Sequence, residues 1–142
     1  MSPDPRQHSA EHILTAVMGN LFGGKIIDTR FKGNKVRCDF EIKSKLPLEE
    51  IIQQAERAAN KIISQSINVS FEEVSLAEAQ NRCSLHRLPE KMESVQLVCM
   101  GKDVITPCCG DHVKNTTEIG SLKIRTFHFT EPEVLRLTFG VE

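Results

Sequence analysis

The sequence predicts a single α+β domain in which a mostly antiparallel sheet packs against two main helices. Two segments repeat apolar residues with the helical period, and several shorter segments alternate apolar and polar residues as strands do. A chain of 142 residues, 39% of them hydrophobic and 26% charged, can bury one core and is too short for two ordinary domains. We therefore expect one domain over residues 1–142.

Composition excludes several classes of protein. No stretch approaches the ~20 apolar residues that span a bilayer, and the N-terminus lacks the apolar core of a signal peptide. A cytoplasmic protein without membrane contact is expected. The net charge of −1 excludes a uniformly basic nucleic-acid coat but permits a local basic patch. The five cysteines have no framework spacing, which favours buried thiols or metal ligands over disulfides.

The first helix has clear start and stop signals. Asp4 can cap it, Pro5 suits the first helical position, and Gln7 has the spacing of a capping box. The helix should run to about Leu21 and end at Gly23-Gly24.

A helical wheel with 100° per residue separates two faces of this helix. His8 and His12 lie opposite the apolar face, in a stripe with Thr15 and Gly19, so we expect both histidines to point away from the core. The apolar face comprises Ala10, Ile13, Leu14, Val17, Met18 and Leu21.

The rest of the chain predicts strands around one more long helix. Gly33-Asn34 is a two-residue hairpin turn, and Glu131-Pro132 should join the last two strands. The expected elements are strands at 25–32 and 35–42, a helix at 46–64, a strand at 67–74, a short helix at 76–82, an irregular segment at 84–94, and strands at 95–100, 120–129 and 134–141.

Two distant segments carry residues that bind zinc in proteins. His8 and His12 are one helical turn apart, so both rings can point at one ion. Cys108 and His112 can converge in a turn that Gly110 allows to be tight. Each pair alone is a weak signal, because such spacings occur by chance and cysteines are often simply buried. Together, they favour a zinc site with four ligands.

The spacing also excludes a familiar zinc enzyme. Metalloproteases with the His-Glu-x-x-His motif carry their general base next to the first histidine. Here Ser9 occupies that position, and Glu11 lies about 60° from the direction of His8 on the wheel. We therefore reject a protease.

The two motifs read His8-Ser-Ala-Glu-His12 and Cys108-Cys-Gly-Asp-His112, and Asn115-Thr-Thr-Glu-Ile-Gly120 follows the second. In this order they resemble the editing domain shared by alanyl- and threonyl-tRNA synthetases. The nearest resemblance is to the free-standing, small-type alanyl-tRNA editing proteins, and it covers nearly the whole chain. It implies the fold of the synthetases' second additional domain.

The resemblance also implies a function. Such proteins are hydrolases that cleave the ester joining serine or glycine to tRNA for alanine. The zinc would sit on His8, His12, Cys108 and His112, which would form the catalytic centre. Cys109 remains an alternative sulfur ligand, although the four-residue spacing of the motif favours Cys108.

Candidate substrate contacts lie near the two motifs. Ser9, Thr15, Thr116 and Thr117 could read the hydroxyl of serine, although such residues often serve as caps instead. Phosphates at the acceptor end of the tRNA could meet Arg30, Lys32, Lys35 and Lys114, and Phe31 could stack on a terminal base. An ordinary solvated strand face explains the basic residues equally well.

Two other functions remain open at this point. One is editing of the threonyl type, which acts on seryl-tRNA for threonine. The other is an RNA-binding module without catalysis, because four protein ligands form the closed set that is typical of structural zinc.

Overall fold

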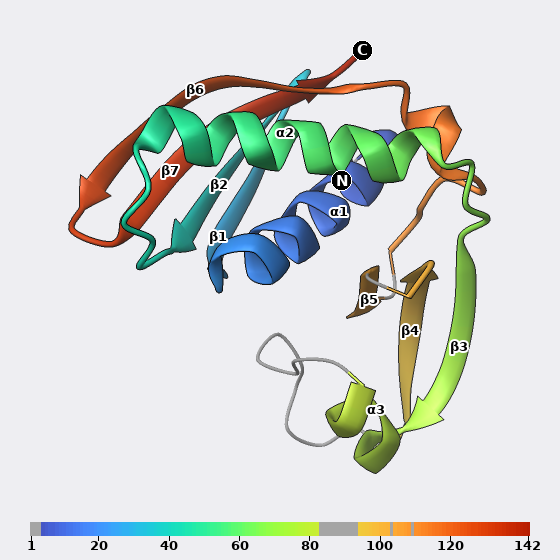
Figure 1. Cartoon of the computed structure of the whole chain (residues 1–142). Helices are drawn as coiled ribbons and strands as arrows, with labels where there is room; N and C mark the ends of the chain where they lie inside the picture. Colours follow the sequence, from blue (N-terminus) through green and yellow to red (C-terminus); the bar gives the residue numbers. More distant parts are fainter. Residues whose placement is uncertain (1–3, 83–93, 103, 109) are drawn as a thin grey trace.

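The computed structural model describes residues 4–82, 94–102, 104–108 and 110–142 (Figure 1). No helix among them is long and apolar enough to cross a membrane. The elements in chain order are α1 (Pro5–Phe22), β1 (Lys25–Lys32), β2 (Lys35–Glu41), α2 (Leu48–Ser64), β3 (Ser70–Ser75), α3 (Leu76–Arg82), β4 (Ser94–Met100), β5 (Val104–Pro107), the 3₁₀ helix η1 (Thr116–Ile119), β6 (Leu122–Glu131) and β7 (Val134–Val141). The α+β class and the antiparallel pairing are confirmed.

The larger sheet has four antiparallel strands in the order β1-β2-β7-β6. The row Val36, Cys38 and Phe40 on β2 faces Phe139, Leu137 and Leu135 on β7, and all six side chains are fully buried. They share one core with the apolar residues of α1 and α2, which lie over the same face of the sheet (Figure 1). On the other face, Arg136 donates two hydrogen bonds to the Asp39 carboxylate, at 2.9 and 3.1 Å.

A second, three-stranded sheet has the order β3-β4-β5. Val98 on β4 belongs to the main core, while Val95, Leu97 and Cys99 pack with Ala79 of α3 in a smaller cluster. Side chains alternate along a strand, so one face of this sheet is turned toward α1 and the other toward α3. Helix α1 contacts β1 and β7 of the larger sheet and β5 of the smaller one (Figure 1).

The structure differs from the expected elements in three places. The strands divide into two sheets instead of one, because β4 pairs with β3 and β5, and none of these three strands pairs with a strand of the larger sheet. Neither β5 nor η1 was expected, and both are only four residues long. The strand expected at 67–74 begins at Ser70, and of the irregular segment at 84–94 only Ser94 is among the described residues, where it starts β4.

Candidate metal centre

Helix α1 begins as the sequence predicts, and this fixes the position of its first histidine. The Asp4 carboxylate accepts a hydrogen bond of 2.7 Å from the Arg6 backbone N–H, and Gly23 ends the helix with φ 65°. Gln7 does not complete a capping box. Its side-chain amide donates a hydrogen bond of 2.8 Å to the carbonyl of Gly33. The tip of the β1–β2 hairpin is thereby held against the helix beside His8.

The second half of the site is the segment 107–113, which we call the cysteine turn. On its N-terminal side, the Cys108 backbone N–H donates to the carbonyl of Gln96 at 3.1 Å. On its C-terminal side, the Val69 backbone N–H donates to the carbonyl of Lys114 at 2.8 Å, and η1 follows. The described part of the turn is therefore anchored to β4 on one side and to the residue just before β3 on the other.

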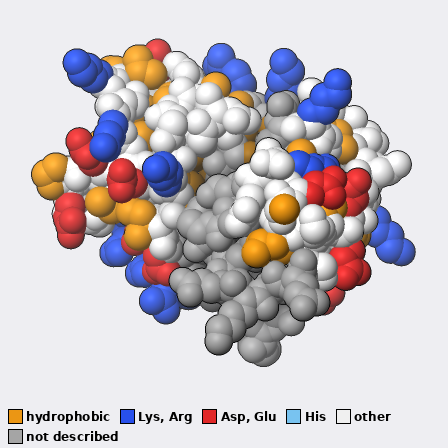
Figure 2. Space-filling model, turned by 90° about the horizontal axis from the view of Figure 1, so that it is seen from below, with side chains coloured by type: hydrophobic (Ala, Val, Ile, Leu, Met, Phe, Trp, Pro, Cys, Tyr) orange, Lys and Arg blue, Asp and Glu red, His pale blue; other side chains and the backbone are white. Residues whose placement is uncertain are grey.

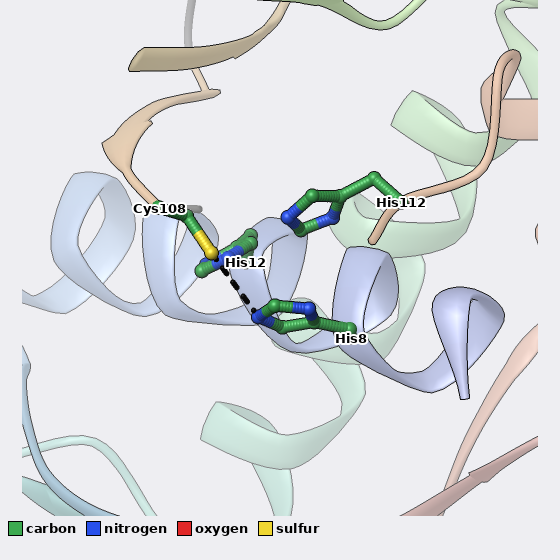
Figure 3. A group of neighbouring side chains, drawn as sticks. All are labelled: His8, His12, Cys108 and His112. Atoms are coloured by element: carbon green, nitrogen blue, oxygen red, sulfur yellow. Dashed lines mark hydrogen bonds between the residues drawn. The ribbon is translucent and has the colours of Figure 1, made fainter. Parts of the chain in front are cut away.

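The cysteine turn brings its two metal-ligating residues onto the two histidines of α1 (Figure 3). The ligand atoms of His8, His12, Cys108 and His112 lie within 4.8 Å of one another. The Cys108 Sγ is 3.4 Å from His8 Nε2, and the ring centroids of His8 and His112 are 4.2 Å apart. The sequence therefore predicted correctly that these four residues come together. Cys109, the alternative sulfur ligand, lies outside the described residues.

Hydrogen bonds on the outer ring nitrogens decide which nitrogen faces the cluster. His8 Nδ1 is 3.2 Å from the carbonyl oxygen of Asp111. A carbonyl only accepts, so Nδ1 carries the proton and Nε2 keeps its lone pair for a ligand. His112 Nδ1 lies 3.1 Å from the Ser9 hydroxyl, which leaves its Nε2 on the cluster side.

Ser9 joins the helix to the cysteine turn. Its side chain is fully buried, and its oxygen accepts a hydrogen bond of 3.1 Å from the Val113 backbone N–H in addition to its contact with His112. When His112 Nδ1–H donates to the same oxygen, both lone pairs of the hydroxyl are occupied. Ser9 then orients a ligand from outside the cluster, a position that protein metal sites commonly fill with a hydrogen-bonding group.

His112 is held in the neutral form that metal binding needs. Burial is the main cause, and the neighbouring His12 and His8 the lesser ones, that together lower the pKa of His112 to about 3. Its Nε2 is buried and has no hydrogen-bond partner among the described residues. A buried ring nitrogen with a lone pair and no donor nearby is costly, and a metal ion at this point would satisfy it.

The four residues fit a metal ion in chemistry and in size. Ligand atoms around a tetrahedral, zinc-sized ion lie roughly 3.5 Å apart, so movements on the order of 1 Å would close the observed cluster around it. The Gly110 backbone N–H donates to Cys108 Sγ at 3.3 Å, a bond that suits a thiolate. A Cβ at Gly110 would lie 2.4 Å from His8 Cε1, so the turn can approach the ring only as glycine.

Glu11 is a part of the site that the sequence analysis did not select. Its carboxylate is 1% exposed and lies 3.1 Å from His12 Nδ1. The hydroxyls of Thr15 and Thr29 donate to its Oε1 at 3.2 and 3.1 Å. The sequence offered one sign of this role, because Glu11 directly precedes His12 in the helical motif. The wheel, however, placed Glu11 away from His8, and its partner Thr29 lies on β1 and not on the helix.

The burial of His12 corrects one expectation. The wheel placed both histidines on a face turned away from the core, yet His12 is 3% exposed and His8 is half-buried. The helix is buried on nearly every side, because the smaller sheet and the cysteine turn cover the face that the larger sheet leaves open. The prediction of an open helix face was therefore wrong for His12.

The chain is similar to two kinds of known protein, whereas no model of a protein family matches it. Over 135 residues, 94% of this chain, it is 29% identical to the alanyl-tRNA editing protein AlaX-L of Pyrococcus horikoshii. Over 122 residues, 84% of this chain, it is 32% identical to the alanine–tRNA ligases of Staphylococcus aureus strains JH9 and Newman. The chain is homologous to both proteins. It spans 33% of the length of AlaX-L and 14% of the length of the ligases.

A cavity of about 540 Å³ adjoins the cluster at His12. It lies where α1, β1 and β5 meet, and most of its wall is apolar. The lining residues are His12, Thr15, Ala16, Gly24, Lys25, Ile26, Ile27, Glu41 and the four residues of β5, from Val104 to Pro107. Because β5 was not expected from the sequence, the cavity that it lines could not be predicted either.

The structure separates the four candidate hydroxyl residues. Thr15 lines the cavity, whereas Ser9 is occupied by His112 and Val113. Thr116 is fully buried, donates to the Ile63 carbonyl and accepts from the Ile67 backbone N–H, both at 3.0 Å. Thr117 is exposed and bonds to Asn115, the N-cap of η1.

The candidate tRNA contacts lie around the cluster and not in one patch. Lys32 and Lys35 are exposed and face each other at the hairpin tip, and Lys114 is exposed just after the cysteine turn. The Arg30 guanidinium is paired with the Asp28 carboxylate at 3.0 Å. Figure 2 shows one face of the molecule, on which Lys and Arg side chains stand apart among acidic ones.

Proposed function

We propose that this protein is a zinc-dependent hydrolase that removes wrongly attached amino acids, serine above all and glycine as well, from tRNA for alanine. The observation that carries the proposal is the convergence of His8, His12, Cys108 and His112 beside a cavity, in a chain homologous to an alanyl-tRNA editing protein. The acceptor end of the charged tRNA is the proposed partner.

Zinc is the ion that this donor set suits best. Three imidazole nitrogens and one thiolate are a common zinc combination, whereas calcium and magnesium prefer oxygen ligands. The same four residues would form the catalytic centre. Zinc bound there would supply a Lewis acid for the ester carbonyl or lower the pKa of a water toward ~7.

The residues of the chain would hold and select the substrate. The cavity beside His12 would receive the aminoacyl end, because His12 is both a candidate ligand and part of the cavity wall. Thr15 is the proposed reader of the serine hydroxyl, since it is the one of the four candidates that lines the cavity. Its hydroxyl donates to Glu11, and its oxygen can still accept a hydrogen bond from the serine hydroxyl. A site that bonds this hydroxyl would spare alanine, which has none.

Phosphate contacts would hold the tRNA itself. Lys32, Lys35 and Lys114 are exposed near the two ends of the cluster and carry no ion pair to a described residue, so they are the proposed phosphate contacts. Arg30 would contribute less because Asp28 already neutralises part of its charge. Binding should weaken as salt is raised.

A second function keeps one observation in its favour. Four protein ligands close a tetrahedron, which is the arrangement of structural zinc. An RNA-binding module that hydrolyses nothing would use the same cluster only for folding. Editing of seryl-tRNA for threonine is the other alternative.

Four charged tRNAs separate these functions: seryl-, glycyl- and alanyl-tRNA for alanine, and seryl-tRNA for threonine. The zinc-loaded protein should hydrolyse the first far faster than the third and fourth. His12→Ala and Cys108→Ala should abolish hydrolysis, and Cys99→Ala, a buried cysteine outside the cluster, should retain it. If the zinc-loaded protein hydrolyses none of the four charged tRNAs, the proposal is overturned. If Cys109→Ala loses zinc and Cys108→Ala keeps it, the sulfur ligand is Cys109 and not Cys108.

A further inference from the structure

Phe71 on β3 is a large apolar side chain that is not buried in either hydrophobic cluster. It is 49% exposed and belongs to neither the main core nor the smaller cluster around α3 among the described residues. The protein has seven phenylalanines and no tryptophan or tyrosine, so exposed aromatic rings are scarce. Leaving half of such a ring in water forfeits much of the stabilisation that its burial would bring.

The register of the smaller sheet turns Phe71 toward the candidate metal centre. Phe71 pairs with Val98 of β4, and directly opposed residues of antiparallel strands share a face. Val98 is fully buried in the main core, so this is the face turned toward α1. The Phe71 ring lies 6.3 Å from the His112 ring, measured between centroids.

A second phenylalanine lies at the other side of the cluster. Phe31 on β1 meets His8 edge-on, with ring centroids 5.9 Å apart. It is only half-buried, but it packs against the main core. The four candidate ligands are therefore flanked by one aromatic ring from each sheet, and of the two, Phe71 has the freer face.

We propose that Phe71 is a stacking platform for an unpaired base at the 3′ end of the RNA substrate. This inference rests on the proposed function, because an ester brought to the cluster carries its terminal ribose and unpaired base to the rim of the site. Aromatic side chains stack on unpaired bases of any sequence, since each base offers a π face. The lysines near the cluster would act on phosphates, whereas Phe71 would act on the base.

Phe71→Leu tests the platform while it keeps the position apolar. With seryl-tRNA for alanine, KM should rise about 5- to 150-fold, the range to which stacking of ~1–3 kcal/mol per base converts, and kcat should change little. Phe71→Tyr should restore the KM, because it restores the ring. Phe129→Leu is the matched control: Phe129 is 43% exposed on β6, and its KM should equal that of the wild type.

A substrate without its terminal base separates stacking from a general loss of structure. The wild type should lose affinity for this abasic RNA, whereas Phe71→Leu should lose little, because its stacking contact is already gone. A KM for Phe71→Leu equal to that of the wild type, or an equal additional loss with the abasic substrate, would overturn the inference.

A binding measurement keeps the inference distinct from the proposed function. A short oligoribonucleotide with the sequence of the tRNA 3′ end should bind the wild type more tightly than Phe71→Leu, and the difference should vanish for the abasic oligoribonucleotide. This result, in a protein that hydrolyses no ester, would sustain the platform and overturn the hydrolase. Equal binding by both proteins would overturn the platform alone.

Discussion

Ser9 shows how one side chain can govern a metal ligand that lies about a hundred residues away in sequence. Its buried oxygen holds both His112 Nδ1 and the Val113 N–H at 3.1 Å. These two contacts set the ring plane of His112 and the path of the backbone beside it. Since the hydroxyl is occupied, we expect Ser9 to position His112 and not to read a substrate.

Ser9→Ala should lower the zinc affinity about 10- to 100-fold, the usual effect of losing a group that orients a metal ligand. The measurement is competition with a chelator of known affinity. Ser64→Ala is the control, because Ser64 is exposed and bonds only to the Lys61 carbonyl among described residues. An unchanged zinc affinity in Ser9→Ala would show that the turn orients His112 without the hydroxyl.

His112 should also impose a pH dependence on the metal-free protein. Its pKa is lowered from 6.5 to about 3 in the folded state, so below pH 6.5 the unfolded chain binds a proton that the folded chain refuses. The free energy of unfolding should therefore fall as the pH is lowered from 6.5 toward 3, by at most about 1.4 kcal/mol per pH unit from this group.

Urea unfolding of metal-free wild type and His112→Asn between pH 4 and 7 measures this effect. The variant should show a shallower fall, because asparagine takes up no proton. Asp39 cancels in this comparison because both proteins contain it: Arg136 lowers the pKa of Asp39 below 3.8, so its stabilisation begins to be lost below about pH 5 to the same extent in each. Equal slopes in the two proteins would contradict the assignment to His112.

At the scale of elements, the site depends on a short turn held between two sheets and a helix. β5 leads into the cysteine turn, η1 leaves it, and α1 lies against it. Asn115 and Glu118 cap η1 in a reciprocal pair, and Thr116 fastens it to the end of α2. The turn can therefore come close to α1 without support from a long element of its own.

Gly110→Ala should test this close approach. The added Cβ would lie 2.4 Å from His8 Cε1, so either the ring or the turn must move away. We expect zinc affinity to fall about tenfold or more, with little change in the far-ultraviolet circular dichroism of the protein. Gly33→Ala is the contrasting variant, since a Cβ there meets nothing within 4 Å, although its φ of 60° strains the hairpin. Gly110→Ala with the zinc affinity of the wild type would show that the turn adapts freely.

The sequence predicted those elements whose signals are local. Asp4, Pro5 and Gly23 mark the ends of α1, and the alternation after Gly33-Asn34 marks β2. It did not predict β5 or the second sheet, because β5 is four residues long and exists only through its pairing with β4. The division into two sheets depends on contacts between distant segments, which no local pattern records.

The candidate ligands were predictable for a similar reason. His8 and His12 on a helix, and Cys108 and His112 in a turn, each have a short spacing that is typical of metal ligands. The two pairs together therefore predicted a four-residue cluster, which the structure contains. The roles of Ser9 and Thr116 were not visible, because their partners are about a hundred and about fifty residues distant. The burial of His12 likewise follows from β5 and the cysteine turn and not from the helix itself.

At the scale of the whole molecule, the cluster ties the N-terminal helix to the C-terminal half of the chain. Two ligands come from α1 and two from the cysteine turn, so an ion bound by all four joins segments about a hundred residues apart. Glu11 adds an electrostatic reason. A divalent ion with one thiolate leaves a single positive charge, which would balance the buried Glu11 carboxylate beside His12.

Zinc should therefore stabilise the fold as a whole. At a free zinc concentration of a thousand times Kd, the gain is about 4 kcal/mol, which for a domain of this size corresponds to a rise in Tm of roughly 10 °C or more. Calorimetry with zinc and with chelator measures the shift. Cys108→Ala and His12→Ala should abolish it, while Cys99→Ala should keep it, because Cys99 packs on the face turned toward α3. If the Tm of the wild type is the same with zinc and with chelator, the four residues hold no ion. The buried charge of the Glu11 carboxylate would then be compensated by its contacts with Thr15, Thr29 and His12 alone.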